Sequence, residues 1–330
     1  MKAFTITERG GQPSLQEVPQ PEPAAGEVLV EVEAASVNGF DLSVAAGYVW
    51  DMLPHEFPVV LGRDVVGTVT AVGDGVDDVP IGDRVAGVIP GVDLGPRNGS
   101  FAEHVSLPAA AVTRVPAGVE PHDAAVIGLA GIAAHDALQA LHLRPGETVL
   151  ISGATGGVGS ITLQLAVAAG ATVIATARPG QEEEYVRGLG ATHTVDYTGD
   201  IIAAVKTVAP EGVDKALHAA GDAATIGQVV RTGGAVASTL AATPEQLGRD
   251  DVTVTGIMAA ATADKLARLL EHVAAGKLRV NVEARVPLDR VRSYGVRSVQ
   301  GAMAGRPMSP AELAEWLGTS QPAPVPEPIG

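Results

Sequence analysis

No cysteine occurs among the 330 residues of this sequence. The absence excludes disulfide bonds, zinc sites built from thiolates and a cysteine nucleophile. It does not name a compartment, because a reduced cytosolic protein and a secreted protein without disulfides give the same count. The histidines show no HxH or HExxH spacing, so we expect no bound metal.

Basic residues are also few: 22 Lys and Arg stand against 38 Asp and Glu, which gives a net charge of −16. A protein of this sign repels the phosphates of nucleic acids and the surfaces of anionic membranes, so we expect neither as a partner. The first 13 residues contain no apolar stretch of signal-peptide length, and no charge-free run resembles a lipid-spanning segment. The sequence therefore predicts a cytoplasmic protein without an anchor.

Aromatic residues make up only 3% of the chain, whereas 46% of it is hydrophobic, most of that Ala, Val, Leu and Ile. This composition is typical of an alanine-rich α/β protein and argues against disorder over most of the length. A chain of 330 residues exceeds the roughly 250–300 at which one hydrophobic core stops growing, so we expect two domains.

Strand-like runs fill the first part of the chain, up to about residue 116. Apolar and β-branched residues gather at 27–37, 65–73 and 83–89, and Gly, Pro and Asp separate these runs. This part predicts a compact all-β module.

A different pattern begins at Asp123, where helical stretches alternate with short buried strands. Alternation of this length predicts a parallel sheet with helices on both faces. The apolar run 252–258 predicts its last strand, and 263–278 predicts an amphipathic helix, after which we expect the chain to rejoin the first module. The Pro-rich end predicts an unstructured tail.

A glycine-rich loop follows the predicted strand 148–152 and precedes a helical stretch at 160–170. Glycine permits a tight turn and close approach of the backbone, and the N-terminus of the next helix offers free N–H groups to a pyrophosphate. A second strand at 172–177 completes the pattern of a dinucleotide site. The loop residues of this predicted site are Gly153, Ala154, Thr155, Gly156, Gly157, Val158 and Gly159.

The end of the second strand bears on the choice of cofactor. Sites selective for NAD place a carboxylate there to bind the ribose 2′-OH, but this chain has Ala175-Thr176-Ala177-Arg178. Thr176 can donate a hydrogen bond and Arg178 can pair with a 2′-phosphate, so the sequence favours NADPH. Two alternatives stay open: Arg178 is a solvated loop charge, or the acidic run 182–184 folds inward and opposes the phosphate.

Several motifs then follow one another in a fixed order. They are SVNGFD at 36–41 with Gly47-Tyr48, PVVLGRDVVG at 58–67, the VG and GDRV elements of 72–85, GSFAEH at 99–104 and SGATGGVGSITLQLA at 152–166. Together they resemble the zinc-free, quinone-oxidoreductase-like branch of the medium-chain dehydrogenase/reductase superfamily, across nearly the full length.

This resemblance implies the domain organisation. It implies a GroES-like catalytic β-domain at 1–118, completed by 276–318, and a Rossmann NADPH-binding domain with a doubly wound parallel sheet at 119–275. We predict a disordered Pro-rich tail at 319–330. The segment 296–330 departs from the family pattern and leaves the substrate open.

The same resemblance bears on metal chemistry. Zinc-dependent relatives bind their metal with a Cys, the His of a GHE motif and a later Cys, whereas the matching positions here are Asn38 and Gly62-Arg63-Asp64. The comparison implies hydride transfer without zinc, which suits a quinone or the activated C=C of an enone. Asn38 and Tyr48 are the predicted catalytic hydrogen-bond donors.

Other side chains receive structural or cofactor roles. We expect Asp41, Asp64 and Asp83 to stabilise loops and turns, and Trp50, Met52 and Phe57 to shape the pocket, and we leave Arg63 undecided. The resemblance implies cofactor contacts beyond the glycine loop at Tyr197, Ala220, Gly221, Thr239, Leu240 and Ile257.

Assembly and substrate leave alternatives. The run 252–258 is expected at a sheet edge, where it can pair with its copy in a homodimer. An enoyl-thioester reductase or a secondary-metabolite pathway reductase is the enzymatic alternative to a quinone or enone reductase, with Arg63, Arg97, Arg292 and Arg297 as candidate phosphate anchors. A non-catalytic NADPH-binding sensor is the alternative from another class.

Overall fold

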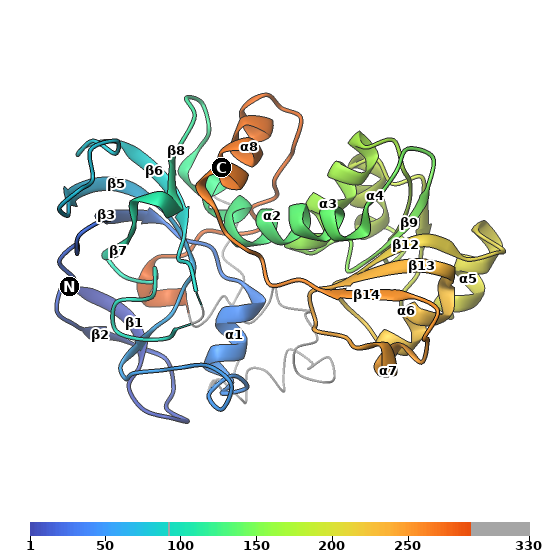
Figure 1. The fold of residues 1–330 in the computed structure, drawn as a ribbon, viewed down its shortest axis with the longest axis horizontal. Helices are drawn as coiled ribbons and strands as arrows, with labels where there is room; N and C mark the ends of the chain where they lie inside the picture. Colours follow the sequence, from blue (N-terminus) through green and yellow to red (C-terminus); the bar gives the residue numbers. More distant parts are fainter. Residues whose placement is uncertain (92, 292–330) are drawn as a thin grey trace.

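The computed structural model describes residues 1–91 and 93–291, which form two domains (Figure 1). The first domain is built on two antiparallel sheets, whose buried residues form separate hydrophobic clusters. The five-stranded sheet has the order β7 (His104–Pro108), β3 (Glu27–Ala34), β5 (Asp64–Val72), β6 (Arg84–Val88), β8 (Val112–Arg114). The three-stranded sheet has the order β2 (Ser14–Glu17), β1 (Lys2–Ile6), β4 (Val59–Val60).

The prediction of an all-β module needs a correction, because the helix α1 (Gly39–Ala45) and the 3₁₀ turn η1 (Ala109–Ala111) interrupt the strands. The carboxylate of Asp41 accepts a hydrogen bond from the backbone N–H of Asn38 at 2.7 Å, in the first turn of α1. Such a bond satisfies a donor that the start of a helix leaves free. The helix is too short to show a periodic pattern in the sequence.

The second domain contains one six-stranded sheet, and every strand in it runs parallel to its neighbours. Its order is β11 (His193–Val195), β10 (Thr172–Thr176), β9 (Thr148–Ser152), β12 (Val213–His218), β13 (Val230–Ser238), β14 (Thr253–Gly256). In chain order this is 3-2-1-4-5-6, the doubly wound Rossmann arrangement. The direction of winding reverses between β9 and β12, and such a switch point opens a ligand crevice at the carboxyl ends of the strands.

Helices cover both faces of this sheet, as the alternating pattern predicts (Figure 1). On one face lie α2 (Pro121–Leu141), α3 (Gly157–Ala168) and α4 (Gln181–Gly188). On the other lie α5 (Ile201–Val208), α6 (Ala223–Val229) and α7 (Pro244–Leu247). The amphipathic helix α8 (Ala263–Ala274) packs Leu266, Leu269 and Leu270 against α2.

Helix α2 is long and apolar enough to cross a membrane by length and composition, and 61% of its most apolar window is buried inside the protein. Ile127 and Ile132 are completely buried there, in a cluster that also contains Val66 and Ala86 of the first domain. Packing between the two domains therefore accounts for the apolar character of α2.

The chain returns to the first domain after α8. Leu288, in the turn η2 (Leu288–Arg290), and Val291 pack against a cluster that contains Phe4 and Trp50. The predicted boundaries at 118/119 and 275/276 stay predictions. The predictions for the continuation to 318, the tail 319–330, the divergent segment 296–330 and the anchors Arg292 and Arg297 lie outside the described residues.

Candidate active site

The glycine loop lies between β9 and α3, next to the switch point of the sheet. Gly153 adopts a φ of +76°, a left-handed conformation that favours glycine. A Cβ atom on Gly159 would lie 2.0 Å from the carbonyl oxygen of Gly153, so only glycine lets the helix approach the turn this closely. The N–H of Gly156 donates to the carbonyl of Gly153 at 3.0 Å, and Gly157 is exposed at the start of α3, where N–H groups can bind an anion. The loop therefore fits a pyrophosphate.

Two side chains beneath the loop stabilise its shape. The hydroxyl of Thr176 accepts a hydrogen bond from the N–H of Gly153 at 2.9 Å and donates one to the carbonyl of Ile151. The Ser152 hydroxyl donates to the carbonyl of Ala220, which brings the ends of β9 and β12 together. Thr176 is only 2% exposed, so it supports the loop from inside the domain. The sequence reasoning missed Ser152, which no local pattern distinguishes.

The exposed Arg178 and the half-buried Glu182 and Tyr197 form one group beyond the ends of β10 and β11. The guanidinium of Arg178 contacts the carboxylate of Glu182 at 2.5 and 2.8 Å and lies 5.9 Å from the ring centroid of Tyr197. The Tyr197 hydroxyl donates to Glu182 at 3.2 Å. Burial acts to raise the pKa of Glu182, but the hydrogen bonds and charge of Arg178 outweigh it and lower that pKa. One member of the acidic run 182–184 thus folds inward, onto the arginine.

The predicted cofactor contacts Ala220, Gly221, Thr239, Leu240 and Ile257 follow the carboxyl ends of β12, β13 and β14. Thr239 N–H donates to the carbonyl of His218 at 3.0 Å, and Leu240 N–H donates to the Ser238 hydroxyl at 3.2 Å. Ile257 N–H donates to the carbonyl of Ser238 at 2.8 Å.

His218 holds the neighbouring loop in this region. Its ring nitrogens lie 3.0 Å from the Ser238 hydroxyl and 3.1 Å from the carbonyl oxygen of Gly221. Burial lowers the pKa of His218, which favours the neutral ring. The sequence predicts a surface or helix-packing histidine here, which is wrong: His218 is buried at the end of β12 and joins two of the segments predicted to contact the cofactor.

The loop after β14 is stabilised by side chains of α2 and α8, outside the sheet. Asp136 of α2 accepts a hydrogen bond from the N–H of Ala260 at 2.9 Å and pairs with Lys265 of α8 at 2.7 Å. Lys265 also donates to the carbonyl of Ala260 at 2.8 Å. Ala259 has a φ of +51°, and Met258 is 78% exposed. The partners are 124 residues apart in sequence, so no local signal reveals this contact.

Asn38 lies in the first domain, immediately before α1. Its side-chain amide donates to the carboxylate of Asp64 at 2.8 Å and to the hydroxyl of Ser36 at 3.2 Å. The Ser36 hydroxyl donates in turn to the same oxygen of Asp64. Both amide hydrogens of Asn38 therefore have partners within the domain.

Asp64 connects this group to the second domain. Its other carboxylate oxygen accepts a hydrogen bond from the N–H of Leu129, in the middle of α2, at 2.6 Å. A Cβ atom on Gly128 would lie 2.3 Å from that oxygen, so glycine is needed for the approach. Asp64 is completely buried, and desolvation raises its pKa to about 6 against the bonds from Ser36 and Asn38.

Asp41 is the second buried carboxylate of this group. It accepts from the N–H groups of Asn38 and Gly62, at 2.7 and 3.1 Å. Desolvation, aided by the nearby charge of Asp64, raises the pKa of Asp41 to about 7. These contacts agree with the structural roles expected of both aspartates.

The predicted donor Tyr48 and the expected pocket residues Trp50, Met52 and Phe57 fall into two groups. Trp50 is 4% exposed and packs against Phe57 with ring centroids 5.3 Å apart, so these two belong to the interior of the first domain. Tyr48 and Met52 are 48% and 69% exposed on the loop that follows α1. The loop therefore presents one phenol and one thioether on the surface.

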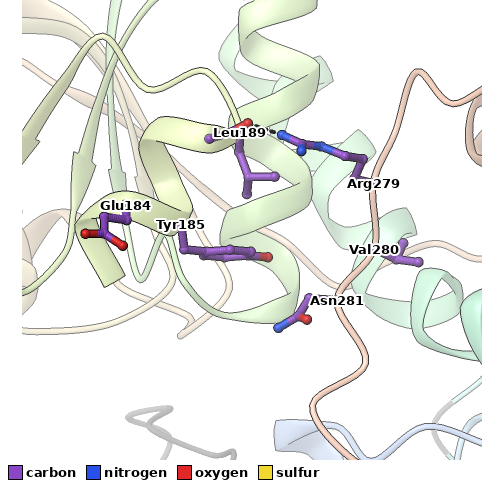
Figure 2. A pocket seen from close by; sticks show the side chains of 7 residues that line it. Glu184, Tyr185, Leu189, Arg279, Val280 and Asn281 are labelled. Carbon is purple, nitrogen blue, oxygen red and sulfur yellow. Dashed lines mark hydrogen bonds between the residues drawn. The ribbon is translucent and has the colours of Figure 1, made fainter. Parts of the chain in front are cut away.

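A cavity of 310 Å³ lies apart from these residues, between α4 and the chain that leaves α8 (Figure 2). The side chain of Gln164, on α3, forms two hydrogen bonds with the backbone of Arg279, at 2.8 and 2.9 Å. The Arg279 guanidinium donates to the carbonyl of Gly188, at the end of α4. None of the predicted site residues lines this cavity, whose walls are Glu184, Tyr185, Gly188, Leu189, Arg279, Val280 and Asn281.

Two family models match the chain. Residues 24–117 match the alcohol dehydrogenase GroES-like domain, and residues 157–275 match the zinc-binding dehydrogenase domain. A solved alcohol dehydrogenase superfamily protein from Novosphingobium aromaticivorans is 32% identical, with a TM-score of 0.77 over 86% of this chain and 90% of that one. Among the described residues, no three His, Asp or Glu side chains form a group suited to a metal ion.

Similarity to a protein of named activity indicates the branch of dehydrogenases to which the chain belongs. The chloroplastic quinone-oxidoreductase QR1 of Triphysaria versicolor is 27% identical over 90% of this chain and 94% of its own length. A GroES-like domain joined to a Rossmann domain is the architecture of medium-chain dehydrogenases/reductases. The chain belongs to this superfamily, in its quinone-oxidoreductase-like branch.

Two further matches bear on the cofactor and the substrate. A mycobacterial protein solved in complex with NADPH is 29% identical, with a TM-score of 0.77 over 88% of this chain and 93% of that one. A mycocerosic acid synthase-like polyketide synthase of Mycobacterium tuberculosis is 38% identical over 175 residues. That match spans 53% of this chain and 8% of the synthase.

Proposed function

We propose that the protein is an NADPH-dependent oxidoreductase that reduces a quinone or the activated C=C of an enone without a metal ion. The proposal rests on the turn from Gly153 to Gly159. A Cβ atom on Gly159 would fill the space in which the start of α3 approaches this turn. Membership of the quinone-oxidoreductase-like branch supports the reaction class. The bound cofactor supplies a hydride.

The residues of the second domain bind and orient the cofactor in this proposal. The exposed start of α3 at Gly157 binds the pyrophosphate, Gly156 closes the turn through its bond to Gly153, and Thr176 and Ser152 keep the loop in shape. The other binding residues are Ala154, Thr155 and Val158 of the loop and, beyond it, Arg178, Tyr197, Ala220, Gly221, Thr239, Leu240 and Ile257.

The residues of the first domain bind the substrate. We assign Asn38 and Tyr48 to the carbonyl oxygen of the quinone or enone. The 3.2 Å bond from Asn38 to Ser36 is the longer of its two, and a substrate oxygen can share that hydrogen. The chain contains no cysteine, and Asn38 and Arg63 occupy positions where zinc-dependent relatives have metal ligands. In this proposal, hydrogen bonds therefore polarise the carbonyl of the substrate.

Turnover assays test this function. NADPH oxidation is measured with a panel of benzoquinones, naphthoquinones, cyclic enones and enoyl thioesters, before and after treatment with a metal chelator. We expect reduction of quinones or enones at a rate that the chelator leaves unchanged. Loss of activity on chelation would contradict the metal-free mechanism, and tight NADPH binding without turnover of any substrate would indicate a sensor instead.

The contact between Arg178 and Glu182 predicts how the cofactor is selected. Arg178→Ala removes the cation that binds a 2′-phosphate, so we expect NADPH affinity to fall about tenfold or more while NADH affinity stays within about twofold. Calorimetric titration with both cofactors measures the effect. Glu182→Gln is the matched variant: it frees Arg178 from its partner and is expected to strengthen NADPH binding. Equal affinity of the parent for NADPH and NADH would refute the assignment.

A second candidate activity is the reduction of enoyl thioesters, supported by the 38% identity with a polyketide synthase. The thioesters in the panel distinguish the two substrate classes.

For assembly, we propose a homodimer in which β14 pairs with its copy, because β14 is the edge strand of the sheet, next to β13. The predicted cytoplasmic location also stands as a proposal.

A further inference from the structure

Arg63 lies in the same buried group as Asn38. It is 6% exposed, its guanidinium carbon lies 5.3 Å from the ring centroid of Phe40, and its Nη2 donates to the carbonyl of Gly91. The charges of Asp41, Asp64 and Asp93 act on it, and the first two of these accept hydrogen bonds from Asn38. Arg63 and Asn38 are therefore coupled to the same two carboxylates at the start of α1.

The second terminal nitrogen of Arg63, Nη1, is buried and has no hydrogen-bond partner among residues 1–91 and 93–291. The neighbouring carboxylates direct their oxygens elsewhere: Asp41 binds Asn38 and Gly62, and Asp64 binds Ser36, Asn38 and Leu129. An arginine stays protonated in a protein, so Nη1 keeps its hydrogens. A buried donor without a partner costs free energy, which a bound oxygen atom would recover.

We propose that Nη1 of Arg63 donates to the carbonyl oxygen of the hydride-accepting enone or quinone and stabilises the negative charge that develops there. This inference rests on the proposed function and makes Arg63 a catalytic residue. Arg63 adds a cationic donor to the neutral donors Asn38 and Tyr48, because its Nη1 hydrogens have no partner within the described chain. A cationic donor in a site shielded from water stabilises an oxyanion more strongly than a neutral amide does.

The electron balance of the step is simple for an enone. Its β-carbon gains a hydride, with both electrons, from a dihydronicotinamide. The C=C electron pair moves to the bond between the α-carbon and the carbonyl carbon, and the C=O pair moves to oxygen. Arg63 keeps its protons and donates a hydrogen bond to this enolate oxygen. The α-carbon then takes a proton from water and the C=O bond re-forms, so one hydride and one proton are added in total.

Binding of 4-nitrophenol tests the proposal without turnover. Its ionised form mimics an enolate, and the two protonation states differ in absorption spectrum. In the full-length protein with NADP⁺ we expect the phenolate to bind at least about tenfold more tightly than the neutral phenol, which lowers the pKa of the bound phenol by about one unit. Arg63→Met is expected to abolish this preference. Arg84→Met removes an exposed arginine of the same domain and is expected to preserve it.

The outcomes separate the two proposals. A wild-type protein that binds the neutral phenol as tightly as the phenolate overturns the role of Arg63, even if the Met variant does not fold. With an enone as substrate, Arg63→Met is expected to lower kcat by about 10²–10³ at unchanged NADPH affinity, and Arg63→Lys by less. Unchanged turnover in Arg63→Met overturns this inference alone. No turnover by the wild type with any substrate overturns the proposed function and this inference with it.

Discussion

Replacing Gly159 with alanine is expected to weaken NADPH binding by at least about 100-fold, close to 3 kcal/mol. The new Cβ would lie 2.0 Å from the carbonyl oxygen of Gly153, which is backbone and cannot turn aside. Helix α3 must then move away from the turn, and the N–H groups at its start lose their alignment with the pyrophosphate. Quenching of protein fluorescence by NADPH, or calorimetry, measures the dissociation constant.

Gly188→Ala is the matched control. Gly188 ends α4, its φ lies outside the left-handed region, and among the described residues no atom outside its own helix backbone and chain neighbours lies within 4 Å of a Cβ placed there. This variant is expected to bind NADPH as the parent does. If Gly159→Ala also keeps the affinity of the parent, the loop is not the pyrophosphate site and the cofactor assignment fails.

Replacing Asp64 with alanine is expected to lower the free energy of unfolding by about 3–5 kcal/mol. The substitution leaves three donors without their acceptor: the Ser36 hydroxyl, the Asn38 amide and the N–H of Leu129. Each buried donor left alone costs about 1–3 kcal/mol. Urea denaturation at pH 8 measures the change. Asp51→Ala removes an exposed carboxylate paired with Arg9 and is expected to cost less than about 1 kcal/mol.

The destabilisation caused by Asp64→Ala is expected to change with pH in one direction. The pKa of Asp64 is raised from 3.8 to about 6 in the folded protein, so the folded state binds more protons than the unfolded state between these values. The stabilisation from its protonation is complete below pH 4 and is lost as the pH rises through 6. The difference between wild type and Asp64→Ala is therefore expected to shrink from pH 4 to pH 6 and then to level off. A difference that grows over this range would show that Asp64 is ionised throughout.

The Rossmann domain is predictable from sequence because its signals are local. Each buried strand, the glycine turn and the helix that follows lie within about twenty residues, and chain order then constrains the sheet order. The run 252–258 correctly predicts an edge strand, seen as β14 at Thr253–Gly256. The GroES-like domain follows from motifs in fixed order, yet its helix α1 is missed because a two-turn helix shows no periodicity.

The site is less predictable because its contacts join distant segments. One amide hydrogen of Asn38 has its partner in Asp64, which lies 26 residues away in sequence. The inward position of Glu182 depends on its contacts with Arg178 and Tyr197. Composition and motif matching carry no information on either contact. The free donor of Arg63 is likewise visible only when the partners of both aspartates are known.

Helix α2 also limits how the two domains can move. Its 21 residues span about 32 Å, and along this length it packs against β5 and β6 of one domain and α3 and α8 of the other. Helix α2 therefore couples the two domains, with the bond from Leu129 to Asp64 close to the midpoint of the helix. Asn38, which donates to Asp64, is thereby held at the junction of the two domains.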